Sequence, residues 1–188
     1  MTSPVHDAST SAPAQIDALF ESHIAEYPDF PIPGVLFRDI TPLLRDAAAL
    51  RAVIAHWTTL IPEGVDYVIG TEARGFVLGA PLAYEIGAGF IPVRKAGKLP
   101  GSPAGLTYDL EYGTARIEIP ENSLPAGARV LLVDDLLATG GTAAATLELA
   151  RRFDVEVLGA TFLIELAALG GRDRLPGVEL STVWRIEA

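Results

Sequence analysis

The sequence predicts an α/β fold in which helices flank a twisted, mostly parallel sheet, and two observations carry this prediction. Apolar, β-favouring segments alternate with helix-forming segments from about residue 66 to residue 186, as in a parallel sheet with crossover helices. One of these segments, Val130–Val133, is unbroken by any polar residue, which is typical of a strand covered on both faces. With 188 residues and 49% hydrophobic content, the chain suits one domain with its own core.

The amino-terminal part of the chain is expected to be partly irregular. Residues 1–14 are rich in Ser, Thr, Ala and Pro and lack the basic start and apolar centre of a signal peptide. They predict a loose tail on a cytoplasmic protein. Apolar residues at helical spacing predict an amphipathic helix over 15–27. Prolines and a glycine break regular structure over 29–34, an irregular or short-strand segment follows over 35–42, and a second helix is expected over 46–60.

The middle of the chain predicts a strand–helix–strand unit followed by a long loop. We expect a strand over 66–70, a turn over 71–75, a helix over 76–86 and a second strand over 89–93. A Gly- and Pro-rich loop then extends over 94–109. Its length is at the upper end for a connection without secondary structure, which usually marks a functional or mobile loop.

The carboxyl-terminal part is expected to supply the remaining strands. Alternating polar and apolar residues over 116–119 predict an antiparallel strand. The central apolar strand is followed by helix formers from Ala143 to about Phe153, for which Thr142 can serve as the N-cap. Further strands are expected within 155–166 and over 178–186.

The segment that joins the central strand to its helix has the residues of a binding site for a phosphorylated sugar. The apolar run stops at Asp134 and Asp135, and a short Thr-Gly-Gly-Thr turn ends at Thr142. Glycines let a phosphate approach the backbone, and N–H groups at a helix start bind anions. The carboxylates can accept hydrogen bonds from a vicinal diol, at the strand end where open α/β sheets bind ligands. The alternative is a plain strand–loop–helix connection with a solvated acidic turn.

The two adjacent acids restrict their own surroundings. Two carboxylates about 4 Å apart repel by about 4 kcal/mol at an effective dielectric of about 20. We therefore expect Asp134 and Asp135 to have divergent directions, hydrogen-bond donors or a nearby cation.

Charge and composition exclude several classes of protein. A net charge of −10 disfavours nucleic acid as a partner, and no apolar run approaches the ~20 residues of a membrane span. The lack of cysteine removes disulfides and thiolate metal sites. The two lysines of the chain, Lys95 and Lys98, lie beside Arg94, and no acid occurs between Glu85 and Asp109. This cationic segment is a candidate anion site; the alternative is a solvated loop.

The stretch that ends at Thr142, Val-Asp-Asp-Leu-Leu-Ala-Thr-Gly-Gly-Thr, resembles the phosphoribosyl-pyrophosphate (PRPP) motif of type I phosphoribosyltransferases. It looks most like the motif of the adenine phosphoribosyltransferase family. The resemblance, which extends from about residue 29 to about residue 174, implies a type I phosphoribosyltransferase fold for a single domain over 15–188. It also implies a small hood at about 29–42 and a flexible lid loop at about 94–113. The residues implied to hold the ribose and its 5′-phosphate are Asp134, Asp135, Ala138, Thr139, Gly140, Gly141 and Thr142.

A second motif, Thr71-Glu-Ala-Arg-Gly75, is similar to the pyrophosphate loop of the same family, with Ala73 where serine is common. It is neither a dinucleotide-binding nor a Walker A pattern. The resemblance implies a cis peptide bond between Glu72 and Ala73. The residues implied to bind pyrophosphate, in this loop and in the cationic segment, are Glu72, Ala73, Arg74, Arg94, Lys95 and Lys98.

The base is assigned by resemblance as well. Residues 30–42 resemble the hood, in which Phe37 would stack on the purine while the backbone of Leu36 and Arg38 reads its edge. Leu166 would cover the opposite face, and Glu111, in a stretch similar to the closing part of the lid, would donate or accept the purine proton. By residue type alone, Phe37 would be a core residue and Glu111 a solvated one.

These resemblances imply a purine salvage enzyme that transfers the 5-phosphoribosyl group from PRPP to adenine and releases AMP and pyrophosphate. Mg²⁺ is the implied cofactor; it is carried by PRPP, and the motif allows a water-mediated contact from Asp135. The family is usually homodimeric, so the expected partners are adenine, PRPP and a second copy, without nucleic acid or membrane. The alternatives are a phosphoribosyltransferase for another base such as xanthine, a non-catalytic PRPP-binding regulator, and a nucleoside hydrolase or ribosyl-binding module. The implied catalytic residues are Glu111, Arg74, Asp134 and Asp135.

Overall fold

The computed structural model describes residues 12–110 and 113–187 of the chain. By its internal contacts the chain divides into two compact units, Met1–Val53 and Ile54–Ala188. Every helix within the described residues is too short or too polar to cross a bilayer.

The first unit combines helices with one small antiparallel hairpin. Ala25 pairs with Asp39 and Pro28 with Leu36 across the hairpin, and the side chains of Phe20 and Leu43 are fully buried. In chain order, the elements are α1 (Ala12–His23), β1 (Ala25–Pro28), β2 (Leu36–Asp39), α2 (Thr41–Arg45) and α3 (Ala47–Thr58), the last of which continues into the second unit.

Two sequence predictions for the first unit are wrong in detail. The helix predicted over 15–27 ends at His23, because the backbone from Ala25 onward pairs with β2 instead of continuing the helix. An additional helix, α2, begins at Thr41. Pro42 lies in its first turn, where a missing N–H loses no helical hydrogen bond. The helix predicted over 46–60 is confirmed as α3.

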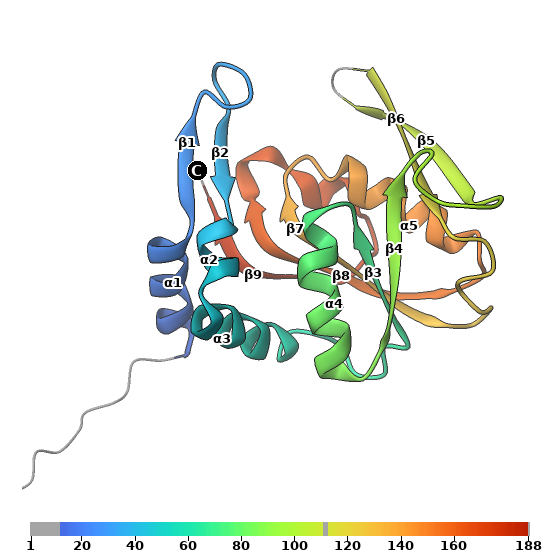
Figure 1. Ribbon diagram of the computed structural model, residues 1–188, viewed down its shortest axis with the longest axis horizontal. Helices are drawn as coiled ribbons and strands as arrows, with labels where there is room; N and C mark the ends of the chain where they lie inside the picture. Colours follow the sequence, from blue (N-terminus) through green and yellow to red (C-terminus); the bar gives the residue numbers. More distant parts are fainter. Residues whose placement is uncertain (1–11, 111–112, 188) are drawn as a thin grey trace, which may run out of the picture. The chain divides into compact units, whose positions relative to one another are not determined.

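The second unit is built on a seven-stranded sheet with the order β5-β6-β4-β3-β7-β8-β9 (Figure 1). The strands from β4 to β9 in this order are parallel, and β6 and β5 form an antiparallel hairpin at one edge. The predicted mostly parallel sheet is therefore confirmed. The strands are β3 (Tyr67–Thr71), β4 (Gly89–Lys95), β5 (Ala104–Leu110), β6 (Gly113–Ile119), β7 (Arg129–Leu137), β8 (Glu156–Leu166) and β9 (Leu180–Ile186).

Two helices connect the parallel strands. Helix α4 (Arg74–Ile86) leads from β3 to β4, and α5 (Gly141–Arg151) leads from β7 to β8. Because β4 and β8 lie on opposite sides of the β3–β7 pair, right-handed connections bring the two helices to opposite faces of the sheet. Residues Val130–Val133 of β7 are accordingly buried on both faces, as the sequence predicted.

The chain direction across the sheet reverses between β3 and β7. The crossover after β3 leads toward one edge of the sheet and the crossover after β7 toward the other. In open α/β sheets, the two diverging connections leave a crevice at the carboxyl ends of the strands, where ligands bind. A ligand site is therefore expected among the residues that follow β3 and β7.

Two strands differ from their predictions. Strand β7 does not stop at the two acids; it continues to Leu137, because its backbone stays paired with β8 as far as Leu137 and Glu165. The loop predicted over 94–109 contains β5, which pairs with β6 along its full length. Alternating apolar residues at Leu106 and Tyr108 were the signal that could have revealed this edge strand.

Candidate active site

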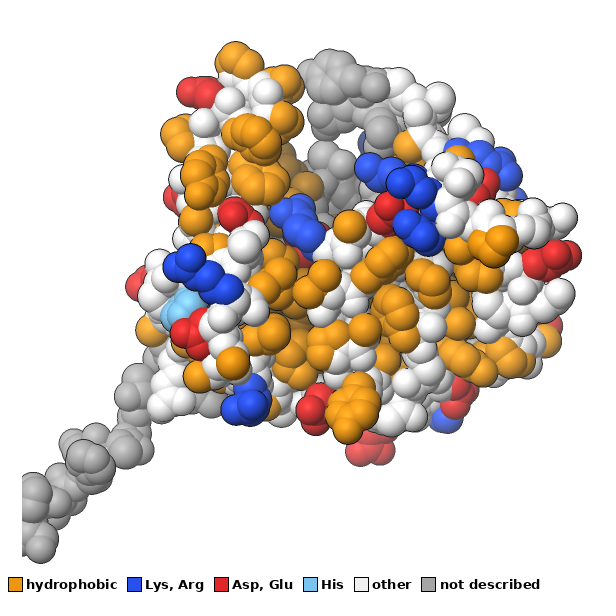
Figure 2. All heavy atoms as spheres, in the orientation of Figure 1, with side chains coloured by type: hydrophobic (Ala, Val, Ile, Leu, Met, Phe, Trp, Pro, Cys, Tyr) orange, Lys and Arg blue, Asp and Glu red, His pale blue; other side chains and the backbone are white. Residues whose placement is uncertain are grey.

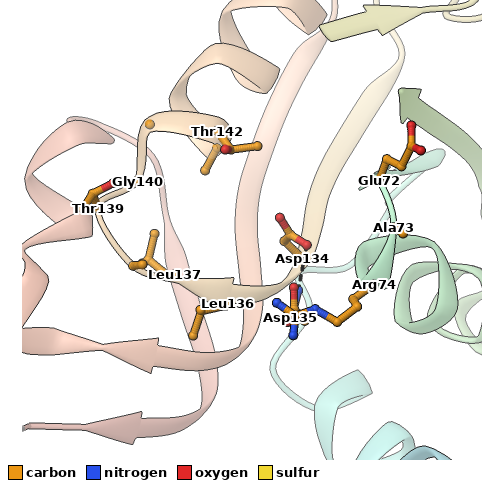
Figure 3. A pocket seen from close by; sticks show the side chains of 13 residues that line it. Glu72, Ala73, Arg74, Asp134, Asp135, Leu136, Leu137, Thr139, Gly140 and Thr142 are labelled. Carbon is orange, nitrogen blue, oxygen red and sulfur yellow. Dashed lines mark hydrogen bonds and ion pairs between the residues drawn. The ribbon is translucent and has the colours of Figure 1, made fainter. Parts of the chain in front are cut away.

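A cavity of about 260 Å³ opens where β3 and β7 end, at the reversal point of the sheet (Figure 3). It is lined by two segments that the sequence had assigned to one ligand. The turn after β3 contributes Glu72, Ala73 and Arg74, and the end of β7 with the start of α5 contributes Asp134, Asp135, Leu136, Leu137, Ala138, Thr139, Gly140, Gly141, Thr142 and Ala143. The peptide bond between Glu72 and Ala73 is cis, as the resemblance implied.

The turn over residues 138–142, called the phosphate turn below, ends at the amino terminus of α5. Gly140 is the residue before the helix and adopts the left-handed conformation, with φ of 78°. The prediction of Thr142 as N-cap is therefore wrong, because the helix already begins at Gly141. The N-cap position has a left-handed conformation, which glycine takes without a steric penalty. Thr142 is the second residue of the helix, and the first turn of α5, whose N–H groups have no partner within the helix, lines the cavity with Gly141, Thr142 and Ala143. This is a geometry that binds anions.

The repulsion between Asp134 and Asp135 is offset in two of the three ways that the sequence predicted, by a cation and by a hydrogen-bond donor. Arg74 at the start of α4 brings its Nε within 2.8 Å of Asp135 Oδ2, and only 6% of Asp135 is exposed. The backbone N–H of Asp135 donates to Asp134 Oδ1 at 2.9 Å. A cation and a donor thus hold the paired carboxylates at the wall of the cavity (Figure 3).

Burial dominates the ionisation of both acids. Removal from water, and then the charge of Asp135, raise the pKa of Asp134 to about 7. The nearby Thr71 hydroxyl opposes this rise, although it makes no well-formed hydrogen bond with any described residue. Burial also raises the pKa of Asp135, against the opposing charge of Arg74. Burial therefore opposes the ionisation of both acids.

Asp134→Asn is expected to raise the melting temperature at about pH 8 by at least about 3 °C, which is about 1 kcal/mol for a chain of this length. The folded-state pKa of Asp134, about 7, lies above the usual 3.8, so the folded state holds this proton more tightly. The stability that the proton contributes is complete below 3.8 and is lost as the pH rises to about 7. Since asparagine stays neutral, the gain should grow over this range and then level off in thermal unfolding scans.

Asp66→Asn is the control with the opposite sign. Hydrogen bonds from the Arg129 side chain and backbone lower the pKa of Asp66, so its ionised form stabilises the folded state above the unfolded pKa. The asparagine variant at this position should lower the melting temperature at neutral pH. A gain at position 134 that stays constant from acid to alkaline pH would contradict the account of Asp134.

A second cavity, of about 440 Å³, shares Glu72 and Thr142 with the first. Lys95 and Tyr108 also line it, and the Tyr108 hydroxyl lies 3.3 Å from Thr142 Oγ1. Neither Tyr108 nor Thr71, which lines the same cavity, was assigned a role from the sequence. For Thr71, its position at the end of a strand was a signal available in the sequence. For Tyr108, only the fold reveals its place in the cavity.

The cationic segment is held at the end of β4 by Glu72. Glu72 Oε2 accepts the Lys95 N–H at 2.9 Å and lies 3.4 Å from Arg94 Nε, and these two contacts lower the pKa of Glu72, the Lys95 N–H first. Arg94 also donates to the Lys98 carbonyl at 3.3 Å. Figure 2 shows basic side chains gathered over this end of β4. Lys95 reaches the second cavity, whereas Arg94 and Lys98 line neither of these two cavities.

The residues predicted for the base lie in three places. Leu36, Phe37 and Arg38 belong to β2 of the first unit, where the Phe37 ring meets Phe30 edge-on at 5.2 Å. Arg38 Nε contacts Glu26 at 3.1 Å. Leu166 is the last residue of β8 in the second unit. Glu111 lies outside the described residues.

Comparison with known proteins agrees with the fold. The sequence model of the phosphoribosyl transferase domain matches residues 41–183, so the class of protein is a phosphoribosyltransferase. The chain is 54% identical over 164 residues to an adenine phosphoribosyltransferase of Acaryochloris marina, a match that covers 87% of this chain and 96% of the relative. The chain belongs to the adenine phosphoribosyltransferase family.

Solved structures support the same assignment. The adenine phosphoribosyltransferase of Thermoanaerobacter pseudethanolicus superposes with a TM-score of 0.88 at 43% identity, covering 91% of this chain and 99% of that one. The enzyme of Saccharomyces cerevisiae, solved in complex with an imino-altritol bisphosphate and adenine, gives 0.84 at 40% identity, with 90% and 99% covered. The type I phosphoribosyltransferase fold implied by the sequence is confirmed.

Proposed function

We propose that this chain transfers the 5-phosphoribosyl group of PRPP to adenine, giving AMP and pyrophosphate in purine salvage. The observation that carries the proposal is the cavity that joins a helix amino terminus to a half-buried acid, a buried acid and an arginine. A ligand that fits this cavity presents an anion to the turn and hydroxyl donors to the acids, which are the features of a ribose 5-phosphate. Relatives at about half identity are adenine phosphoribosyltransferases.

The phosphate turn would bind the 5′-phosphate, and the acids would orient the ribose. Backbone N–H groups at the start of α5, with the hydroxyls of Thr139 and Thr142, supply donors to the phosphate. Asp134 and Asp135 would accept hydrogen bonds from the ribose hydroxyls. Because burial raises the pKa of Asp134, such donors would also stabilise its ionised form.

The leaving pyrophosphate would be held at the other side of the cavity. The transition state resembles an oxocarbenium ion while negative charge develops on pyrophosphate, so fixed donors and cations at that position accelerate departure. Arg74 and the backbone of Glu72 and Ala73 line the cavity there, and Lys95 lines the neighbouring one. Arg94 and Lys98 complete the proposed set, since both belong to the cationic segment that Glu72 anchors.

Mg²⁺ fits the donors at this site as an ion bound mainly by its substrate. No group of three or more His, Cys, Asp or Glu among the described residues could hold a metal, whereas Mg²⁺ typically takes one or two carboxylates together with substrate phosphates and water. Asp134 and Asp135 supply such oxygens in the cavity, and Asp135, which pairs with Arg74, would contact the ion through water. The ion would neutralise charge on the departing pyrophosphate.

Adenine recognition is proposed for the hood residues. Phe37 would stack on the purine, the backbone of Leu36 and Arg38 would read its edge, and Leu166 would contact its other face. Backbone donors and acceptors suit the paired groups of adenine, and a 6-oxopurine would leave buried polar groups unpaired. A homodimer and a cytoplasmic location remain part of the proposal, on the family resemblance.

Glu111→Leu is expected to lower kcat at least about tenfold while PRPP binding is preserved, because a positioned proton donor or acceptor typically contributes a hundredfold or more. Glu111→Gln keeps the size of the side chain but cannot exchange the proton, so it should lower kcat to a similar extent. Steady-state kcat and equilibrium PRPP binding measure the two effects. An unchanged kcat in both variants would remove Glu111 from the chemistry.

PRPP consumption with adenine, hypoxanthine, guanine and xanthine tests the whole proposal. We expect turnover with adenine and much slower turnover with the 6-oxopurines. A preference for xanthine would reassign the base, and PRPP binding without turnover of any base would indicate a regulator. Hydrolysis of a nucleoside to its base and ribose, with no dependence on PRPP or pyrophosphate, would point to the hydrolase alternative.

A further inference from the structure

An ion pair with a buried carboxylate and a half-buried arginine lies next to the phosphate turn. Glu165 of β8 is paired across the sheet with Leu137, the last residue of β7 before the turn, and only 3% of it is exposed. Both of its carboxylate oxygens accept hydrogen bonds from Arg172, at 2.6 Å from Nε and 2.7 Å from Nη2. This two-pronged geometry is the strongest arrangement for an arginine and a carboxylate.

Arg172 belongs to a short 3₁₀ segment, η2 (Gly171–Arg174), that follows β8. Its remaining Nη1 donates to the Leu180 carbonyl at 3.5 Å, and the Thr182 hydroxyl donates to Glu165 at 3.3 Å. The ion pair therefore ties η2 to the ends of both β8 and β9. These contacts fix the position of η2 relative to the sheet.

The backbone of η2 in turn touches the phosphate turn with no side chain between them. A Cβ added to Gly140 would overlap the Gly171 carbonyl oxygen and would lie 3.2 Å from Arg174 Cβ. A Cβ added to Gly171 would overlap the Ala138 carbonyl oxygen and would lie 2.9 Å from Leu137 Cδ1. Because the two backbones pack so closely that neither glycine has room for a Cβ, a shift of η2 must displace the turn.

We propose that Glu165 and Arg172 are positioning residues that hold η2 against the phosphate turn and thereby set the affinity for the 5′-phosphate. Neither residue lines the cavity, so both act through the backbone of the turn. The inference rests on the proposed binding of a 5′-phosphate at this turn. An ion pair with one buried and one half-buried partner is weak evidence for added stability, whereas a rigid donor array at the start of α5 requires a fixed support.

The test compares AMP with adenosine, which lacks the phosphate, in the wild type and in Arg172→Met. The wild type should bind AMP at least about tenfold more tightly than adenosine, about 1.4 kcal/mol. Arg172→Met should reduce this preference at least about fivefold while adenosine binding stays within about twofold, since only the phosphate contacts depend on the turn. Arg172→Lys keeps the charge but cannot form the fork, so it should give an intermediate preference. Isothermal titration calorimetry measures all the dissociation constants.

Arg129→Met is the matched control. Arg129 forms a similar two-pronged pair with Asp66, at 3.2 and 3.0 Å, but at the amino end of β7. This variant should lower the melting temperature and leave the AMP preference unchanged. If Arg172→Met also keeps the wild-type preference, the pair is only structural and the inference is overturned.

Two further outcomes are equally decisive. If Arg172→Met does not fold, Arg172→Lys decides alone: a reduced preference supports the positioning role and a retained one overturns it. If the wild type itself does not favour AMP over adenosine, the proposed phosphate site is wrong and the inference falls with it. A wild-type preference that survives in the Arg172 variants overturns the inference alone and leaves the proposed function standing.

Discussion

Gly140→Ala is expected to lower kcat/KM for PRPP at least about a hundredfold, about 2.7 kcal/mol. Gly140 has φ of 78°, a conformation that alanine disfavours, and its new Cβ would overlap the Gly171 carbonyl oxygen. Since that oxygen belongs to a backbone held by the Glu165–Arg172 pair, it cannot rotate away as a side chain would. The phosphate turn must shift, and the N–H groups at the start of α5 lose their alignment.

Gly127→Ala separates this contact from the cost of the backbone conformation. Gly127 has a similar φ of 76°, but nothing lies within 4 Å of its added Cβ. Both variants should lose some stability in thermal unfolding, and only Gly140→Ala should lose activity with PRPP. Equal kcat/KM values for the two alanine variants would show that the turn tolerates displacement and would refute its role in phosphate binding.

Asp135→Asn is expected to lower kcat/KM for PRPP at least about tenfold, about 1.4 kcal/mol. The side chain is buried at the cavity wall and forms a 2.8 Å ion pair with Arg74. The amide has one accepting oxygen instead of two and carries no charge, so the contacts to both the ribose diol and Arg74 are weakened. Steady-state kinetics with varied PRPP and saturating adenine measure the loss, and KM for adenine should change little.

Asp66→Asn is again the matched control, because it removes the same charge from a carboxylate that pairs with Arg129 far from the turn along β7. It should leave the kinetics with PRPP unchanged. Wild-type kinetics in Asp135→Asn would contradict a role for this acid in ribose binding. A loss of the same size in Asp66→Asn would attribute the effect to stability instead.

Much of the candidate site could be predicted because the residues that line the cavity come from two continuous segments of the chain. The Thr71–Gly75 and Asp134–Thr142 stretches each combine a strand end, a turn and a helix start, and turn chemistry is local. For the same reason the alternation of strands and helices predicted a parallel sheet. Errors occurred where a distant partner overrode local preference, as at Ala25, which pairs with β2, and at Asp134, which stays in β7 because β8 lies beside it.

By itself the sequence determined the α/β class, the residues of the phosphate turn, the acids beside it and the family of the chain. Only the tertiary structure decided that Arg74 pairs with Asp135, that burial raises the pKa of Asp134, and that Arg172 pairs with Glu165 next to the turn. The physical reason is that local preference acts over a few residues, whereas desolvation and ion pairing depend on which distant segments the sheet order brings together.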